Sequence, residues 1–64
     1  MRLTLFWERM RQQFGDAYAS SVAKDHVLAE LDGRTIEQAL AEGVPPKKVW
    51  QAVVATFDVP SRLR

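Results

Sequence analysis

The chain has 64 residues, so it forms one domain at most and buries only roughly 60% of the surface that its unfolded form exposes. Hydrophobic residues make up 47% of the chain and charged residues 27%, which excludes the weakly hydrophobic, highly charged class of disordered proteins. The net charge is only +1, with basic ends and an acidic middle, and this argues against the broad basic face on which nucleic-acid binding normally depends.

The chain contains no cysteine, which excludes disulfides and thiolate metal sites. Small secreted domains usually need one or the other, so we expect a cytoplasmic protein. The charged pair Glu8 and Arg9 follows only a few apolar residues, too soon for a signal peptide, and no run approaches the ~20 apolar residues of a membrane span. We therefore expect a protein that is neither exported nor membrane-spanning.

The first predicted element is an amphipathic helix over residues 5–14. Thr4 is the expected N-cap, because its hydroxyl can accept a hydrogen bond from a first-turn amide. Gly15 is expected to end the helix, because glycine adopts the left-handed conformation at little cost. The apolar face of this helix carries Leu3, Phe6, Trp7, Met10 and Phe14.

The second predicted helix begins after Asp16, which can cap it, and continues through Leu31 before Asp32 and Gly33 break it. Its apolar residues do not form a straight stripe. The helix can therefore kink or restart near Asp25, which would then serve as an internal cap.

The third predicted helix is short and spans residues 36–42. Thr35 and Gln38 have the spacing of a capping box, in which each side chain satisfies an unpaired amide at the helix start. Gly43 is expected to end this helix.

The fourth predicted helix runs from Pro46 to Thr56 or Phe57. Pro46 occupies the first helical position, where its missing amide hydrogen costs nothing. Pro60 is expected to end regular structure and residues 61–64 to form a frayed basic tail. No segment shows a strand pattern.

These elements predict an all-α fold: one compact domain over residues 1–60, built from four helices, or five if the second breaks near Asp25. The last two helices are expected in a helix-turn-helix-like arrangement. The expected core consists of Leu3, Phe6, Trp7, Met10, Phe14, Val22, Leu28, Leu31, Leu40, Val49, Trp50 and Val53.

The residues that carry a family resemblance span nearly the whole chain: 1–4, 6–10, 14–15, 18–19, 25, 27–31, 33–35, 39–40, 43–44, 46, 49–50 and 58–60. They resemble a short actinobacterial family catalogued as domain of unknown function 3046. The resemblance implies a small helical cytoplasmic protein and supplies no activity, cofactor or catalytic residue. Genes of that family often lie near recombinase genes, which implies an association with DNA repair.

The helix-turn-helix-like segment over residues 35–57 carries a DNA-binding hypothesis. Against it, Glu42 stands where such motifs usually have an apolar residue, and Pro45 and Pro46 remove two backbone donors that could hold a phosphate. The presumed recognition helix also lacks arginine, the residue most often used to contact guanine. The candidate contacts to DNA or to a protein partner are Lys47, Lys48 and Gln51.

Trp7 and Trp50 are candidate partner anchors, since tryptophan is enriched among interface hot spots. Each also lies in a helical apolar stripe, so burial in the core is the competing interpretation.

We identify no catalytic, cofactor-binding or metal-binding residues. His26 is the only histidine, and its neighbour Asp25 points about 100° away on a helix, so the two do not form an oriented acid-base pair. We therefore expect a non-enzymatic cytoplasmic module that binds another protein, without a small-molecule substrate. The alternative is a weak DNA-binding or DNA-repair-associated accessory protein.

Overall fold

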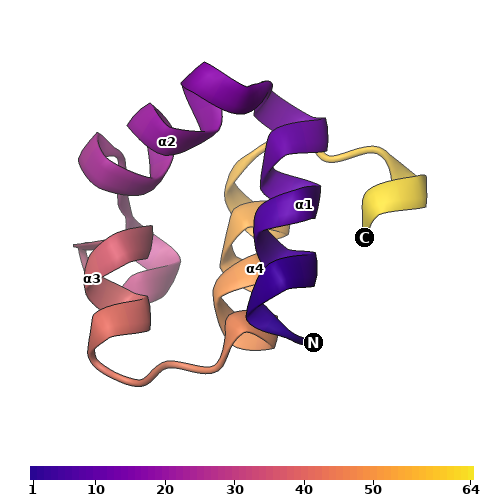
Figure 1. The fold of residues 1–64 in the computed structure, drawn as a ribbon. Helices are drawn as coiled ribbons and strands as arrows, with labels where there is room; N and C mark the ends of the chain where they lie inside the picture. The colour runs from indigo at the N-terminus through magenta and orange to yellow at the C-terminus, as the bar shows by residue number, and fades with distance from the viewer.

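Helix α4 packs against α1 on one side and against α3 and a small hairpin on the other in the computed structural model, which describes residues 1–64 (Figure 1). The predicted helical fold is confirmed, with one small sheet added. The elements in chain order are α1 (Leu3–Phe14), α2 (Asp16–Asp25), β1 (Val27–Leu28), the 3₁₀ turn η1 (Ala29–Leu31), β2 (Arg34–Thr35), α3 (Ile36–Ala41), α4 (Pro46–Thr56) and the 3₁₀ turn η2 (Ser61–Leu63).

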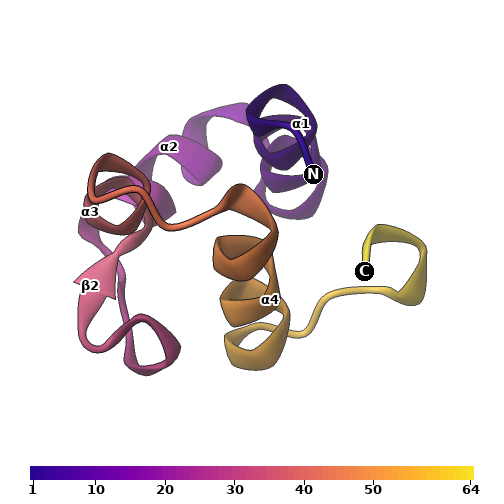
Figure 2. The same cartoon turned by 90° about the horizontal axis from the view of Figure 1, so that it is seen from below.

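Helix α2 connects the two sides of the molecule, because it contacts α1 at one end and the hairpin and α3 at the other (Figures 1 and 2). Both views place the two ends of the chain on the same side of α4, beside α1. The first and last segments therefore meet at one face of the domain.

Helix α1 begins two residues earlier than expected. Its N-cap is Arg2 in an extended conformation, and Thr4 lies within the first turn, so the prediction that Thr4 caps the helix was wrong. The end is as predicted, at Gly15, whose φ of 86° and ψ of 156° suit a residue without a Cβ. Gly15 is also the N-cap residue of α2. Asp16 is the first residue of that helix and its side chain makes no cap hydrogen bond, so the prediction that Asp16 caps the helix was wrong.

Helix α2 ends at Asp25, which corrects the expectation of a helix through Leu31. Of the two alternatives, the break near Asp25 is the observed one, but no fifth α-helix follows it. Residues 27–28 instead pair with residues 34–35 as an antiparallel hairpin, with Val27 opposite Thr35 and Leu28 opposite Arg34. Asp32 at φ 57° and Gly33 at φ 79° make the left-handed turn that returns the chain. The statement that no segment forms a strand was therefore wrong as well.

The predicted starts of α3 and α4 are confirmed. The Thr35 hydroxyl accepts a hydrogen bond from the Gln38 amide at 3.1 Å, and the Thr35 amide donates to the Gln38 side chain at 2.9 Å. Pro46 occupies the start of α4, which ends at Thr56.

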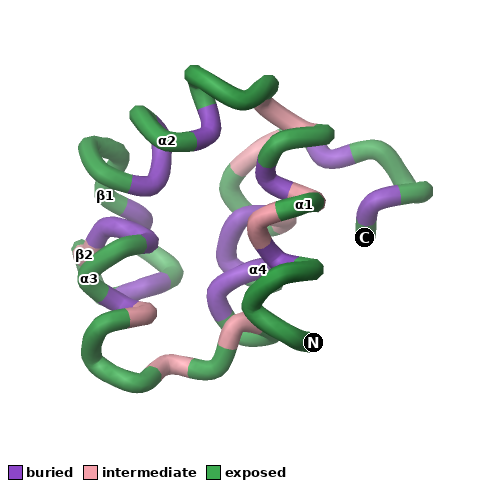
Figure 3. The backbone as a smooth tube through the Cα atoms, viewed as in Figure 1, coloured by how far each residue is buried: buried purple, intermediate pink, exposed green.

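The core lies where α1, α2, α3 and the hairpin face α4 (Figure 3). Leu3 was wrongly placed there: it lies in the first turn of α1 with 48% of its surface exposed. Trp7, Phe14 and Leu40 are only half-buried against the core. Seven residues that the expected core omitted are buried as well: Ala19, Ala23, Ile36, Ala39, Ala52, Val59 and Leu63.

Residues 61–64 are not frayed as expected. Ser61–Leu63 form a 3₁₀ turn, and the Leu63 side chain is buried. The basic residues Arg62 and Arg64 stay exposed on either side of it. An apolar residue between two arginines thus fastens the end of the chain to the domain.

Candidate functional site

Three polar side chains lie exposed along the outer side of α4: Lys47, Lys48 and Gln51, which we call the α4 ridge. They share one side of the helix because the buried positions Val49, Trp50, Ala52 and Val53 occupy the other. None of the three side chains makes a hydrogen bond or an ion pair within the protein. The ridge is therefore free to contact another molecule.

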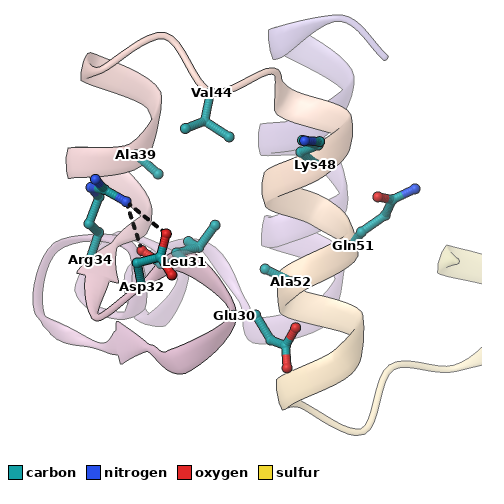
Figure 4. A pocket seen from close by; sticks show the side chains of 9 residues that line it. All are labelled: Glu30, Leu31, Asp32, Arg34, Ala39, Val44, Lys48, Gln51 and Ala52. Atoms are coloured by element: carbon teal, nitrogen blue, oxygen red, sulfur yellow. Dashed lines mark hydrogen bonds and ion pairs between the residues drawn. The ribbon is translucent and has the colours of Figure 1, made fainter.

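A hollow lies on one side of the ridge, between α4, α3 and the hairpin, with a volume of about 360 Å³ (Figure 4). We call it the hairpin hollow. Its apolar walls are Leu31, Ala39, Val44 and Ala52. Its polar lining consists of Glu30, Asp32 and Arg34 from the hairpin side and Lys48 and Gln51 from the ridge.

Arg34 is held in place at the edge of the hairpin hollow. Its Nε lies 2.8 Å from a carboxylate oxygen of Glu42, and its Nη1 lies 3.5 Å from a carboxylate oxygen of Asp32. The same Nη1 donates a hydrogen bond to the Leu31 carbonyl at 3.2 Å. Arg34 thus already has partners within the protein, whereas Lys48 across the hollow forms no hydrogen bond or ion pair.

A second hollow of about 280 Å³ lies on the other side of the ridge, where the two ends of the chain meet. We call it the terminal hollow. Its lining combines apolar and cationic side chains from α1, α4 and the C-terminal segment: Met1, Leu5, Arg9, Lys47, Trp50, Gln51 and Arg64.

The C-terminal segment is held beside the terminal hollow by one hydrogen bond from α4 and one within the segment. The buried indole Nε1 of Trp50 donates to the Leu63 carbonyl at 3.0 Å, and Arg64 Nε donates to the Val59 carbonyl at 3.1 Å. The second bond leaves the two terminal nitrogens of the Arg64 guanidinium without a partner in the protein.

The two tryptophans differ in their surroundings. Trp50 is only 2% exposed, so it belongs to the core, although its edge contributes to the terminal hollow. Trp7 is half-buried and stacks edge-on against Phe6 with ring centroids 5.2 Å apart. Trp7 therefore has more free surface for a partner than Trp50.

A third hollow of about 220 Å³ gathers residue types found in hydrolytic sites, namely Ser21, Asp25, His26 and Tyr18. No hydrogen bond joins any of these side chains to another. The His26 ring instead lies 5.0 Å from the ring of Phe57. The geometry thus lacks the oriented contact between base and nucleophile that activates a serine.

The two hollows beside α4 differ in the charge of the side chains that line them. Glu30 and Asp32 line the hairpin hollow, whereas the side chains lining the terminal hollow include three cations and no acid. Sequence reasoning identified Lys47, Lys48 and Gln51 but missed Arg9 and Arg64. The spacing of Leu5 and Arg9, which places them on one face of a helix, was the available signal for Arg9.

No cluster of three or more histidine, aspartate or glutamate side chains is close enough to hold a metal ion. No helix has the length and apolar character needed to cross a membrane.

Comparisons with known proteins give a family and no activity. No curated protein and no solved structure matches the chain significantly. The model of one family matches residues 1–62, which is nearly the whole chain. The chain therefore belongs to the family described as "Protein of unknown function (DUF3046)".

Proposed function

We propose that the protein is a small, non-enzymatic, cytoplasmic module that binds another protein through the α4 ridge. One observation carries this proposal: Lys47, Lys48 and Gln51 are exposed, make no internal bonds and stand between two hollows. Gln51 contributes to both hollows, so a partner lying across the ridge could fill either one.

The surface around the ridge has the mixture of groups that protein interfaces use. Interfaces combine apolar contacts in their centre with polar and charged groups at their edge. Met1 and Leu5 are exposed apolar residues beside the ridge, with 38% and 37% of their surfaces exposed. Arginine, which is enriched at interfaces, is present as Arg9 and Arg64.

The non-enzymatic part of the proposal is supported by the lack of an assembled acid, base and nucleophile. Ser21 and His26 line the same hollow without a hydrogen bond between them. The cytoplasmic part is supported by a sequence without cysteine, which suits a reducing compartment.

Weak DNA binding is the second candidate, favoured by the two adjacent unpaired lysines on the ridge. Its signature would be binding that weakens steeply as salt rises, because phosphate contacts release counterions. Replacing both Lys47 and Lys48 by glutamate should then abolish binding to duplex DNA. Affinity no better than millimolar at low ionic strength, or affinity unchanged by this double substitution, would rule the candidate out.

Site-specific photo-crosslinking in the native cell tests the proposed function. A photoreactive residue at Gln51 lies on the ridge, and one at Ser20 lies on an exposed position of α2 that lines none of the three hollows. We expect Gln51 to give a discrete protein adduct that survives nuclease treatment and Ser20 to give none. Equal crosslinking at both positions, or an adduct that nuclease removes, would contradict the proposal.

A further inference from the structure

We infer that the terminal hollow receives an acidic peptide segment of the partner, which inserts one large apolar side chain between α1 and α4. This inference rests on the proposed function and adds the place of contact and the chemistry of the partner. It concerns the side of the ridge that carries Lys47, whereas Lys48 lines the other side.

Charge supplies the first argument. Arg9, Lys47 and Arg64 line the terminal hollow, and none of them forms an ion pair within the protein. No acidic side chain lines it. The charged side chains of this hollow therefore favour an anionic ligand, and carboxylates suit arginine because its guanidinium can bind both oxygens at once.

Apolar surface supplies the second argument. Leu5 and Met1 are partly exposed in the same hollow, and the edge of Trp50 completes its wall. The volume of about 280 Å³ lies just below the ~300–1,000 Å³ typical of pockets for drug-sized ligands. A hollow of this size suits a single large side chain of a peptide, with acidic neighbours placed over the cations.

The walls of the hollow are fixed before any ligand arrives. The hydrogen bond from Trp50 to Leu63 holds the C-terminal segment against α4, and Arg64 is tied to Val59 through its Nε alone. The remaining guanidinium nitrogens can face a carboxylate without losing an internal bond. A ligand therefore needs to order few groups of this protein, which favours affinity.

The distribution of charge favours a peptide over nucleic acid. A duplex lying across α4 would bring a long row of phosphates past both hollows. The acidic side chains of Glu30 and Asp32 in the hairpin hollow would repel these phosphates. A short peptide can stay in the terminal hollow, where all the charged side chains that line it are cationic.

Two neighbouring lysines provide a matched test of the charge argument. The probe is a fluorescent ten-residue peptide with a central Leu-Phe pair flanked by glutamates, and its binding is measured by anisotropy at low salt. We expect Lys47→Glu and Arg9→Glu each to weaken binding about tenfold, because each replaces an attraction by a repulsion. Lys48→Glu makes the same change in net charge on the adjacent residue, and we expect it to weaken binding less than threefold.

Two leucines of α1 provide a matched test of the apolar argument. Leu5 lines the hollow and Leu3 does not, although both are exposed. We expect Leu5→Ser to weaken binding at least fivefold and Leu3→Ser to leave it unchanged. A second peptide, with serines in place of the central Leu-Phe pair, should bind as weakly to the original protein as the first peptide binds to Leu5→Ser.

Three results would overturn the inference: no measurable peptide binding at low salt, equal losses for Lys47→Glu and Lys48→Glu, or tighter binding of a single-stranded or duplex oligonucleotide through the same residues. Circular dichroism of each variant shows that the fold is retained. If crosslinking at Gln51 gives a protein adduct while the peptides do not bind, the proposed function stands and this inference fails. If neither gives a signal, both fail.

Discussion

The indole nitrogen of Trp50 donates a buried hydrogen bond to the carbonyl of Leu63, 13 residues later in the chain, at 3.0 Å. This bond joins the central helix to the C-terminal segment. It explains why a tryptophan lies at a fully packed position, since its N–H needs a partner when it is buried. It also sets the position of Arg64, and therefore part of the terminal hollow.

We predict that Trp50→Phe lowers the free energy of unfolding by about 1–3 kcal/mol, because it removes the donor and leaves the buried Leu63 carbonyl unpaired. Urea unfolding at constant m-value measures the loss. Trp7→Phe is the matched control, since Trp7 is half-buried and makes no side-chain hydrogen bond. Equal losses in the two variants would show that the hydrogen bond contributes nothing.

We predict that Leu63→Ala destabilises the domain by about 2 kcal/mol, at the low end for a buried leucine because a terminal segment can partly collapse into the space. Arg62→Ala, next to it and exposed, should change stability by less than about 0.5 kcal/mol. Thermal unfolding compares the two. A Leu63→Ala variant as stable as the original protein would mean that the end of the chain is frayed after all.

We predict that Thr35→Ala costs about 0.5–2 kcal/mol, because it removes the acceptor for the Gln38 amide at the start of α3. Thr35→Ser keeps the hydroxyl and should recover most of the loss. Chemical denaturation distinguishes them. If serine fails to restore stability, the effect comes from the lost methyl group at this buried position and not from the cap.

We predict that the ion pair between Arg34 and Glu42 contributes a coupling free energy of only about 0.2–1 kcal/mol to stability. The reason is solvent screening, since 39% of the Arg34 side chain and 52% of the Glu42 side chain are exposed. A double-mutant cycle with Arg34→Met and Glu42→Gln gives the coupling energy. The coupling should shrink in 1 M salt. A coupling that salt does not change would indicate steric contact in place of charge attraction.

Local signals were sufficient to predict three of the four helices. The Thr35 and Gln38 box, Pro46 at a first helical position and Gly15 at a helix end each act through neighbouring backbone groups, so sequence alone displays them. The hairpin was missed because its strands have two residues each and show no alternating pattern. The Asp32 and Gly33 turn was recognised as a helix end, but the pairing of Val27 with Thr35 depends on contacts across the turn.

The surface site was predicted less completely than the fold. Lys47, Lys48 and Gln51 could be placed on the outer side of a helix because helical periodicity determines which residues share a face. Arg64 could not be assigned, because its position depends on a hydrogen bond from Trp50 to the carbonyl of Leu63, which lies beyond the end of α4 in the C-terminal 3₁₀ turn. Glu42 argued against a DNA-binding helix-turn-helix in the sequence, and in the structure it pairs with Arg34 of the hairpin.

Affinity capture from the native cell, with and without nuclease, tests the central claim most directly. The bait proteins are the original sequence, a variant with Lys47→Glu, Lys48→Glu and Gln51→Ala together, and a Lys24→Glu variant that changes an exposed lysine of α2. We predict a reproducible protein partner that survives nuclease treatment, is lost with the ridge variant and is kept with Lys24→Glu. A partner that is captured equally by all three baits, or only in the presence of nucleic acid, would contradict the claim that the α4 ridge binds a protein.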